Sequence, residues 1–363
     1  MADAPAGRLK SLDLFRGATI ASMILVNNPG TWQHVYPPLR HAVWHGWTFT
    51  DTVFPFFLWI VGLAVTLSTA KRVAAGQDKF QLLGHGARRA AILFCFGLIL
   101  TLFPHFDFAG IRIPGVLQRI AVCYLIGLAI FLWSSWRGLI LWTVGLNTLY
   151  LALMIRYPVP GCGAGSWAME CNYARLIDSQ LLAGHMWTAT KDWDPEGIIS
   201  TIPAISTVLL GMLAGYLLRS YATPTEKVRR FVLQGCLMVI AAVALEPAVP
   251  INKALWTTSF VLLMGGLASI CFAAWYWAAD IRGWAKWFKP FEIYGLNAIA
   301  AYMLSGLLAD VMGVTKSGAW VYQNLLLPIA SPINASLLYA LLNVAAVFLA
   351  VWLMYRRGWF LKL

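Results

Sequence analysis

Five polar residues near the start of the chain lie inside or beside strongly apolar segments. They are Asp13, Arg16 and Asn27 in SLDLFRGATIASMILVNN, and His41 and Asp51 at the two ends of HAVWHGWTFTD. An ionisable side chain at the centre of a bilayer costs about 2.5–3.5 kcal/mol, so residues of this kind within apolar segments indicate function. Their types and their closeness in the chain predict a site that does chemistry.

His41 and Asp51 form the pair best suited to acid–base catalysis. Imidazole changes its charge near neutral pH, and a neighbouring carboxylate fixes its tautomer and stabilises its charged form. Trp44 follows His41 by three residues and would shield the ring from bulk water. The competing interpretation of this histidine is a solvated residue at the membrane interface. Asn27 adds an amide that could hold an oxyanion or polarise a carbonyl, or else join two helices.

Other charged residues in apolar segments need partners as well. Asp13 and Arg16 are three residues apart and share a helix face, where an interfacial ion pair and an anion-binding site fit equally well. Arg119, in RIPGVLQRI, has to pair with a carboxylate, with carbonyls or with a ligand. Lys253, in INKALWTTSF, and Asn297, in GLNAIAAY, extend the polar set. Together these residues predict a polar cavity lined by several helices.

The segment DWDPEGIIS places two carboxylates, Asp194 and Glu196, just before an apolar run. Carboxylates stabilise the N-terminus of a helix, so capping is one interpretation. Binding of a cationic acceptor is the other.

The composition fixes the class of protein that must position these residues. Hydrophobic residues make up 60% and charged residues 12% of the 363 positions, and the mean hydropathy is +0.69. These values exclude an ordinary soluble domain and predict an all-α, polytopic transmembrane helix bundle. The first apolar run carries charges and no cleavage site follows it, so we expect it to stay as a helix. Residues 1–363 are expected to form a single transmembrane domain.

Apolar runs long enough to cross a bilayer predict ten spans. Their approximate ranges are 12–29, 50–70, 87–104, 114–133, 138–156, 197–218, 231–247, 254–279, 291–311 and 333–355. Of the 27 Lys and Arg residues, 18 then fall on the side of the N-terminus and 7 on the other side, while Arg16 and Arg119 lie within spans. This excess places both termini in the cytoplasm and the longest loop, 157–196, outside.

The formal net charge of +12 follows from these basic loops. No nucleic-acid motif accompanies it, so we expect no nucleic-acid partner. Membrane orientation and contact with the lipid bilayer explain most of the cations, and a few remain to hold a phosphorylated cytosolic ligand.

Two cysteines, Cys162 and Cys171, lie nine residues apart in the loop expected outside. In an oxidising compartment they form either a disulfide or two free thiols. The sequence has no CxxC pair and no Cys/His cluster, and we therefore expect no metal site.

Seven segments in the same order resemble the heparan-alpha-glucosaminide N-acetyltransferase family, and in particular its bacterial NagX type. They are SLDLFRG, the VN of ILVNN, HAVWHGWT, TDTVFPFFLWIVG, RIPGVLQRI, DPEGI and INKALWTTSF. The resemblance implies a transmembrane acyltransferase in a bacterial inner membrane. Acetyl-CoA would bind from the cytoplasm, and the amino group of a glucosamine-type sugar on the far side would accept the acetyl group.

The resemblance also implies roles for residues of this chain. The family's active histidine corresponds to His41, and its active-site asparagine corresponds to Asn27. We expect direct transfer, in which His41 takes a proton from the sugar ammonium, Asn27 polarises the thioester carbonyl and Asp51 orients the histidine; an acetyl-histidine intermediate is the alternative. The residues expected to bind acetyl-CoA are Arg16, Arg119, Asp13, Trp44 and Lys253, with loop cations among Lys71, Arg72, Arg88, Arg89, Arg229 and Arg230.

An amino-sugar transporter is the main alternative function. Gly/Pro-interrupted spans such as LVNNPG resemble the broken helices of transporters, although the two halves of the chain show no convincing inverted repeat. A structural or signalling subunit is a third alternative, but it leaves the polar cluster without a role. A homodimer is compatible with the sequence, and nothing in the sequence requires one.

Overall fold

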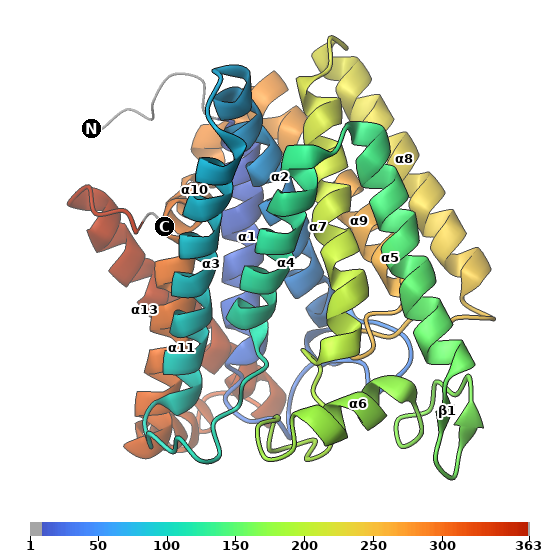
Figure 1. The fold of residues 1–363 in the computed structure, drawn as a ribbon. Helices are drawn as coiled ribbons and strands as arrows, with labels where there is room; N and C mark the ends of the chain where they lie inside the picture. The colour runs from blue at the N-terminus through green and yellow to red at the C-terminus, as the bar shows by residue number, and fades with distance from the viewer. Residues whose placement is uncertain (1–8, 362–363) are drawn as a thin grey trace.

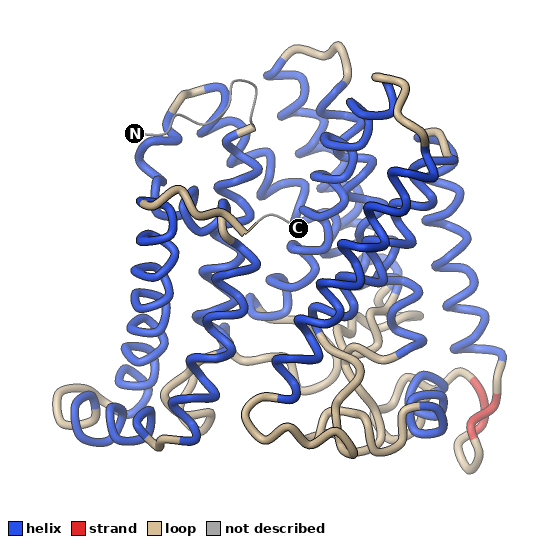
Figure 2. The backbone as a smooth tube through the Cα atoms, turned by 60° about the vertical axis from the view of Figure 1, so that its left-hand side comes forward, coloured by secondary structure: helices blue, strands red, loops and turns tan. Residues whose placement is uncertain are grey.

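The computed structural model describes residues 9–361, which form a bundle of long helices with one short two-stranded hairpin (Figure 1, Figure 2). Most of the long helices run side by side, and α6 lies across one end of the bundle (Figure 1). Arg8 and Lys362 contributed to the expected charge asymmetry and lie outside the described residues.

The long and short elements follow one another in a simple order. The helices are α1 Lys10–Asn27, α2 Phe49–Ala74, α3 Lys79–Leu102, α4 Val116–Trp133, α5 Trp136–Arg156, α6 Tyr173–Leu181, α7 Ile198–Arg219, α8 Pro224–Leu245, α9 Thr258–Tyr276, α10 Lys289–Leu296, α11 Ala298–Val314, α12 Ser317–Val321 and α13 Pro332–Arg356. Four short helical turns are η1 Pro37–Leu39, η2 Trp277–Ile281, η3 Trp284–Phe288 and η4 Tyr322–Leu326. β1 Pro158–Val159 pairs with the antiparallel β2 Gly163–Ala164.

The chain is an all-α, multi-pass membrane protein. Within residues 9–361, eight helices are long and apolar enough to cross a membrane, and a ninth span results if η3–α10 and α11 are taken together. The helix α1 has 18 residues but carries Lys10, Asp13 and Arg16. Each of the ten predicted ranges overlaps α1, one of the eight long apolar helices or the α10–α11 pair. The range 291–311 is not the continuous helix that was expected, because the chain bends there by 72°.

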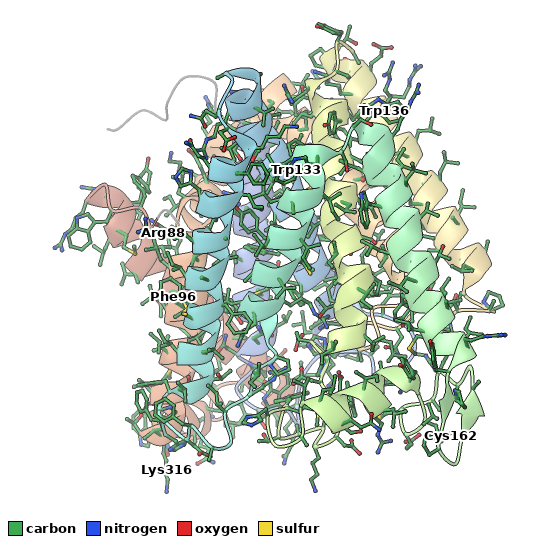
Figure 3. All side chains as sticks on the ribbon, viewed as in Figure 1. Arg88, Phe96, Trp133, Trp136, Cys162 and Lys316 are labelled. Atoms are coloured by element: carbon green, nitrogen blue, oxygen red, sulfur yellow. A yellow bond between two sulfur atoms is a disulfide. The ribbon has the colours of Figure 1, made fainter. Side chains whose placement is uncertain are left out.

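The loops divide between the two ends of the bundle. The connection from α1 to α2, α6 and the hairpin lie at the lower end in Figure 1, and Figure 3 shows Cys162 and Lys316 there, with Trp133 and Trp136 toward the upper end. Cys162 and Cys171 form a disulfide in this lower layer, with Cα atoms 5.9 Å apart, and the first of the two alternatives for these cysteines is confirmed. That the upper end faces the cytoplasm is a prediction from the charge asymmetry.

The centre of the core depends on close contact between α2 and α7. A Cβ atom on Gly62 would lie 1.9 Å from the carbonyl oxygen of Val208, and one on Gly211 would lie 1.9 Å from the carbonyl oxygen of Trp59. The two backbones therefore touch, which is the approach that small residues permit between membrane helices.

Close backbone contact at glycine residues also fixes α1, the helix that carries the predicted site. A Cβ atom on Gly17 would lie 1.7 Å from the carbonyl oxygen of Phe291 in α10. A Cβ atom on Gly295 would lie 2.0 Å from the carbonyl oxygen of Asp13 in α1. The α1–α10 contact thus sets the height and rotation of α1 in the bundle.

The break between α10 and α11 is held by the C-terminal segment. Asn297 Nδ2 donates to the carbonyl oxygen of Trp359 at 3.1 Å, and its Oδ1 accepts from the Leu361 N–H at 3.1 Å. The expected role of Asn297 in lining a polar cavity is wrong, because its amide is used to pair backbone groups at the break. Its neighbours Leu296 and Ala298 instead line a cavity of about 1260 Å³ inside the bundle.

We expect Gly211→Ala to lower the free energy of unfolding by about 1–3 kcal/mol, because the added methyl group overpacks against the backbone of α2. Gly145 in α5 is a matched control, since its added Cβ would meet no atom within 4 Å. Gly145→Ala should be neutral or stabilising by about 0.5–1 kcal/mol through helix propensity. Thermal unfolding of both variants in one detergent measures the difference, and equal stabilities would contradict the close α2–α7 packing.

Candidate active site

Asp51 organises the loop that precedes α2. It is the third residue of that helix and completes a capping box with Thr48. Its Oδ2 accepts from the backbone N–H groups of Thr48 and Ala42, both at 3.0 Å, and its Oδ1 lies 2.6 Å from His41 Nδ1. The side chain is 1% exposed. A single buried carboxylate thus caps the helix and fixes the histidine.

The contact with Asp51 determines how His41 can react. Because the carboxylate accepts from Nδ1–H, the lone pair of the neutral ring stands on Nε2. The His41 side chain is 46% exposed, so part of the ring is accessible to a bound molecule. The predicted pairing of His41 with Asp51 is present in the structure, and the arrangement suits a general base.

Lys253 joins this pair from the connection between α8 and α9. Its Nζ lies 3.0 Å from His41 Nδ1, 3.4 Å from Nε2 and 3.5 Å from Asp51 Oδ1. Burial lowers the pKa of Lys253, and the nearby Asp51 carboxylate opposes that shift. Asn252 holds the connection in place by donating to the carbonyl oxygen of Trp44 at 2.9 Å.

His41, Asp51 and Lys253 line the smaller cavity, which has a volume of about 380 Å³. Asn27, His41, Asp51 and Lys253 form its polar part. Its aromatic walls come from Trp44, Trp187 and Trp193. Trp44 is anchored by its Nε1–H, which donates to the carbonyl oxygen of Trp167 at 2.8 Å, and its ring meets that of Trp193 edge-on.

Asn27 ends α1 and is an exposed residue that lines the smaller cavity. The helix-joining role that was one alternative for it belongs to its neighbour Asn28. Asn28 Nδ2 donates to the carbonyl oxygen of Ile24 at 2.8 Å and to Ser305 Oγ at 3.0 Å. The amide of Asn27 is therefore available to a molecule in the cavity.

Arg112 closes another side of this cavity. Its guanidinium binds both carboxylate oxygens of Asp194, at 2.8 and 2.7 Å, and Glu196 Oε2 at 2.6 Å. Burial disfavours the charge on Arg112, but the hydrogen bonds and charges of Asp194 and Glu196 outweigh it and raise the pKa of the guanidinium. Glu196 lines the cavity together with Arg112.

Capping of α7 by Asp194 or Glu196, one of the two expected roles, is wrong. Asp178 in α6 supplies the cap, because its Oδ1 accepts from the Ile198 N–H at 3.0 Å. Burial raises the pKa of Asp178 to about 6, and the backbone hydrogen bonds from Ile198 and Asp194 oppose that rise. The tertiary contact from α6 thus frees Glu196 to face the cavity.

Arg119 does have partners, as its depth requires, but it lines neither cavity. Its Nη2 donates to Ser200 Oγ and, at 3.1 Å, to the carbonyl oxygen of Gly197, and the guanidinium lies over the ring of Trp256. Only 2% of the residue is exposed. Arg119 therefore ties α4 to the start of α7, and the expected contact with a coenzyme has no support from its position.

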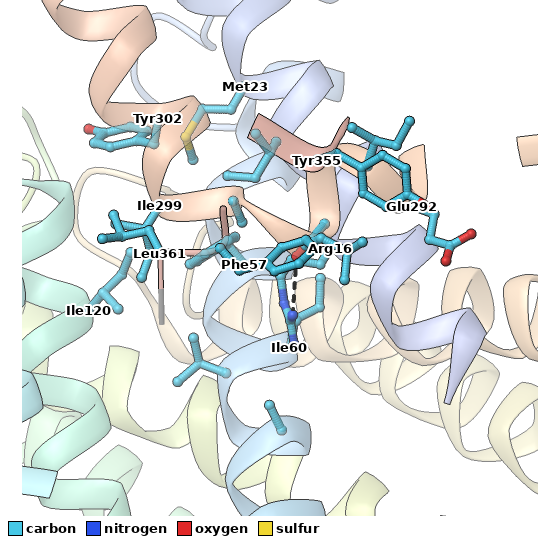
Figure 4. Close-up of a pocket in the computed structure, with 18 of the residues that line it drawn as sticks. Arg16, Met23, Phe57, Ile60, Ile120, Glu292, Ile299, Tyr302, Tyr355 and Leu361 are labelled. Carbon is cyan, nitrogen blue, oxygen red and sulfur yellow. Dashed lines mark hydrogen bonds between the residues drawn. The ribbon is translucent and has the colours of Figure 1, made fainter. Parts of the chain in front are cut away.

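The larger cavity has a volume of about 1260 Å³, and Figure 4 shows Arg16, Met23, Tyr302 and Glu292 among the residues that line it. Six cationic residues line it, namely Lys10, Arg16, Arg89, Lys286, Lys289 and Arg356, against one carboxylate, Glu292. Arg16 Nη1 donates to the carbonyl oxygen of Gly295 at 3.4 Å and lies 3.5 Å from Asp13 Oδ1. Asp13 itself does not line the cavity; the ion pair is present in the structure, and anion binding by Arg16 stays a prediction.

The two cavities meet along one stripe of α1. Arg16, Ile20 and Met23 line the larger cavity, and Met23 and Asn27 line the smaller one. Spacings of three, four and seven residues return to the same helix face, so these side chains follow one another along the axis. Among the described residues, Met23 and Val116 are the two that line both cavities.

Sequence reasoning missed several cavity residues. Of the six proposed loop cations, Arg89 alone lines the larger cavity, whereas Lys286 and Arg356 were assigned to membrane orientation. Arg112 and Trp187 were also missed. The place of Arg112 as the first residue of RIPGVLQRI, and Trp187 and Trp193 in the 187–193 segment, were the available signals.

Comparisons with known proteins were consistent with one another. Residues 8–247 match a sequence model described as heparan-alpha-glucosaminide N-acetyltransferase, catalytic. The chain is 32% identical over 353 residues to heparan-alpha-glucosaminide N-acetyltransferase of Homo sapiens, and 31% identical over 355 residues to the protein of that name from Mus musculus. Each alignment covers 82% of this chain and 52% or 53% of the relative, so the chain spans about half the length of these curated relatives.

We expect Asp51→Ala to cost about 2–4 kcal/mol of stability, because it removes a helix cap and leaves two backbone donors unpaired. Asp78→Ala is a matched control, since Asp78 caps α3 through the Gln81 N–H at an exposed position. It should cost about 1 kcal/mol. Thermal unfolding of the two variants makes the comparison, and a cost no greater at Asp51 than at Asp78 would refute its organising role.

Proposed function

Because the chain belongs to the heparan-alpha-glucosaminide N-acetyltransferase family, we propose that it moves an acetyl group from acetyl-CoA to the amino group of a glucosamine-type sugar across a bacterial cytoplasmic membrane. One observation carries the proposal. A cavity lined by cations and a cavity that contains a histidine–carboxylate pair meet inside the bundle at Met23 and Val116. Such a path lets donor and acceptor react while each stays on its own side.

The cationic lining supports binding of acetyl-CoA in the larger cavity. Coenzyme A carries several phosphate charges, and Lys or Arg side chains bind phosphate through charge-assisted hydrogen bonds. Lys286 and Arg356 are exposed near the mouth of the cavity, and Arg16 lies further in. The phosphates would stay near the mouth while the thioester end extends along α1 toward Met23.

The smaller cavity fits an amino-sugar acceptor. Trp44, Trp187 and Trp193 offer apolar ring faces for the C–H groups of a pyranose. Asp51 and Glu196 line the same cavity as acceptors of hydrogen bonds, each beside a cation, Lys253 or Arg112. Aromatic walls with a few convergent polar groups are typical of small-molecule sites.

The transfer itself uses His41 and Asn27. His41 Nε2 takes a proton from the acceptor ammonium, and the resulting amine attacks the thioester carbon while Asn27 Nδ2 donates to the carbonyl oxygen. A C–N bond forms and the C–S bond breaks. The second proton of the attacking nitrogen passes to the departing thiolate, and the imidazolium releases its proton to water.

Lys253 prepares the base for this step. Its ammonium group lies 3.0 Å from His41 Nδ1 and 3.5 Å from Asp51 Oδ1, so it holds the ring and the carboxylate in place. Lys253 is thus proposed to act on the acceptor side, not in the larger cavity.

An amino-sugar transporter is the second candidate, and the bent α10–α11 pair favours it. Helices broken near mid-membrane commonly form transport sites. In that case the boundary at Met23 and Val116 would open for the sugar, with no chemical step.

We expect the purified protein in liposomes to form N-acetylglucosamine from glucosamine only when acetyl-CoA is supplied, measured by mass spectrometry. His41→Gln should lower kcat by about 10²–10⁴-fold and Asn27→Ala by about 10²–10³-fold, since each loses a contact made at the reacting atoms. His34→Gln is the control, because His34 is exposed in the same loop and lines neither cavity.

Uptake of unmodified glucosamine without acetyl-CoA would instead identify a transporter. In the same preparation, labelled acetyl-CoA without acceptor separates the two enzymatic routes. Direct transfer leaves the protein unlabelled. A stoichiometric label that disappears in His41→Gln would replace direct transfer by an acetyl-histidine route.

We expect Lys286→Gln to raise KM for acetyl-CoA by about 10-fold with little change in kcat, since it removes binding that ground state and transition state share. Arg229→Gln is the control, because Arg229 is an exposed cation in α8 that does not line the cavity. Initial rates at varied acetyl-CoA measure both constants. Equal KM values for the two variants would place the phosphates elsewhere.

A further inference from the structure

The disulfide between Cys162 and Cys171 closes a segment that contacts the wall of the smaller cavity. Trp167 lies between the two cysteines, and its carbonyl oxygen accepts the hydrogen bond from Trp44 Nε1 at 2.8 Å. Trp44 lines the smaller cavity and meets the ring of Trp193 edge-on, with the ring centroids 5.2 Å apart. One hydrogen bond therefore connects the disulfide-closed segment to the aromatic wall of the proposed acceptor site.

The indole ring of Trp44 and its backbone are held by different parts of the chain. Asn252 Nδ2 donates to the Trp44 carbonyl oxygen at 2.9 Å, and the Gly46 N–H donates to the carbonyl oxygen of Ile251 at 2.7 Å. These contacts fix the backbone from the connection between α8 and α9. Among the described residues, the indole N–H has Trp167 as its hydrogen-bond partner, so the orientation of the ring depends on where that carbonyl lies.

The segment from Cys162 to Cys171 is held firmly on the side of α6. Asn172, the N-cap of α6, is 1% exposed, and its Nδ2 donates to the carbonyl oxygen of Ala168 at 2.8 Å. The half-buried Trp167 ring packs against Tyr150 of α5, with the ring centroids 6.4 Å apart.

The other side of the segment has little structure of its own. β1 and β2 each have two residues, and Gly163 and Gly165 both have φ near +78°. Glycine reaches many backbone conformations, so a cross-link removes more freedom here than in a regular element. The disulfide joins Cys162 in this hairpin to Cys171, the residue before Asn172. It thus ties the loose side of the segment to the side that α6 fixes, with Trp167 between them.

We propose that the Cys162–Cys171 disulfide, acting through Trp167, positions Trp44 for binding of the acceptor. The inference rests on the proposed acetyl transfer and adds positioning residues that do not themselves touch the substrate. Trp44 lines the smaller cavity and not the larger one. The imidazole of His41 is held by Asp51, which the capping box fixes independently of this segment. Loss of the disulfide therefore weakens acceptor binding and leaves acetyl-CoA binding and the chemical step unchanged.

The test compares the oxidised protein with the same preparation reduced by tris(2-carboxyethyl)phosphine. Mass spectrometry of an alkylated aliquot verifies that Cys162 and Cys171 are free thiols. We expect reduction to raise KM for glucosamine by about 3–10-fold, the weight of about one hydrogen bond, with kcat and KM for acetyl-CoA unchanged. The double variant Cys162→Ser/Cys171→Ser should match the reduced protein. It should not respond to the reductant, which excludes an effect through the free Cys95 and Cys236.

The variant Trp44→Phe tests the connection through Trp167. Phenylalanine keeps a ring in the wall and loses the Nε1–H, so we expect a similar rise of KM for glucosamine in the oxidised protein. Reduction should then add nothing, because both changes remove the same contact. Trp47→Phe is the matched control, since Trp47 precedes α2 in the same connection, is 43% exposed and lines neither cavity. It should keep the kinetic constants and the response to reduction.

The outcomes are distinct. If the oxidised, unaltered protein forms no N-acetylglucosamine, the proposed function fails. If it does, and reduction leaves KM for glucosamine unchanged, the positioning inference alone is overturned. Equal losses toward both substrates overturn it as well, because they show a disulfide that supports the fold as a whole. Additive effects of Trp44→Phe and reduction contradict the connection through Trp167. If the double serine variant does not fold, reduction of the folded protein decides.

Discussion

The buried carboxylate of Asp51 is the interaction on which the site depends. It accepts from the N–H groups of Ala42 and Thr48 and contacts His41, so one residue caps α2, holds the preceding loop and orients the imidazole. A carboxylate can be buried in such surroundings only when donors and a cation surround it. Lys253 supplies the cation from a segment far along the chain. The same group therefore caps the helix and holds the His41 ring in place.

The second constraint is the packing of α1. Gly17 and Gly295 bring α1 and α10 into backbone contact, which fixes the rotation of a helix that has Arg16, Met23 and Asn27 on one face. That face supplies a cation to the larger cavity, a boundary residue to both and an amide to the smaller one. Helical periodicity thus places the cation, the shared boundary residue and the amide one after another along α1.

Predictions from sequence succeeded where the signal was local. Apolar run length identified the helices, and the nine-residue spacing of Cys162 and Cys171 allowed the disulfide that forms. They failed where a polar residue had several partners to choose from. For Arg119 the sequence left carboxylates, carbonyls and a ligand open, and the structure pairs it with the Gly197 carbonyl and Ser200; α7 is capped from another helix. A buried charge needs a partner, but the residues next to it in the sequence do not identify that partner.

The sequence by itself determined the membrane class, the apolar runs, the charge asymmetry and the side chains able to do chemistry, because these depend on composition and on spacing within one helix. Tertiary structure decided which distant residues meet. Lys253 reaches His41 across 212 positions, and the cations of the larger cavity come from α1, α3, η3, α10 and α13. Those contacts depend on how closely helices approach at residues such as Gly17 and Gly211, and on helix breaks such as the one at Asn297. Such contacts arise from packing between segments, which the spacing within any one segment does not specify.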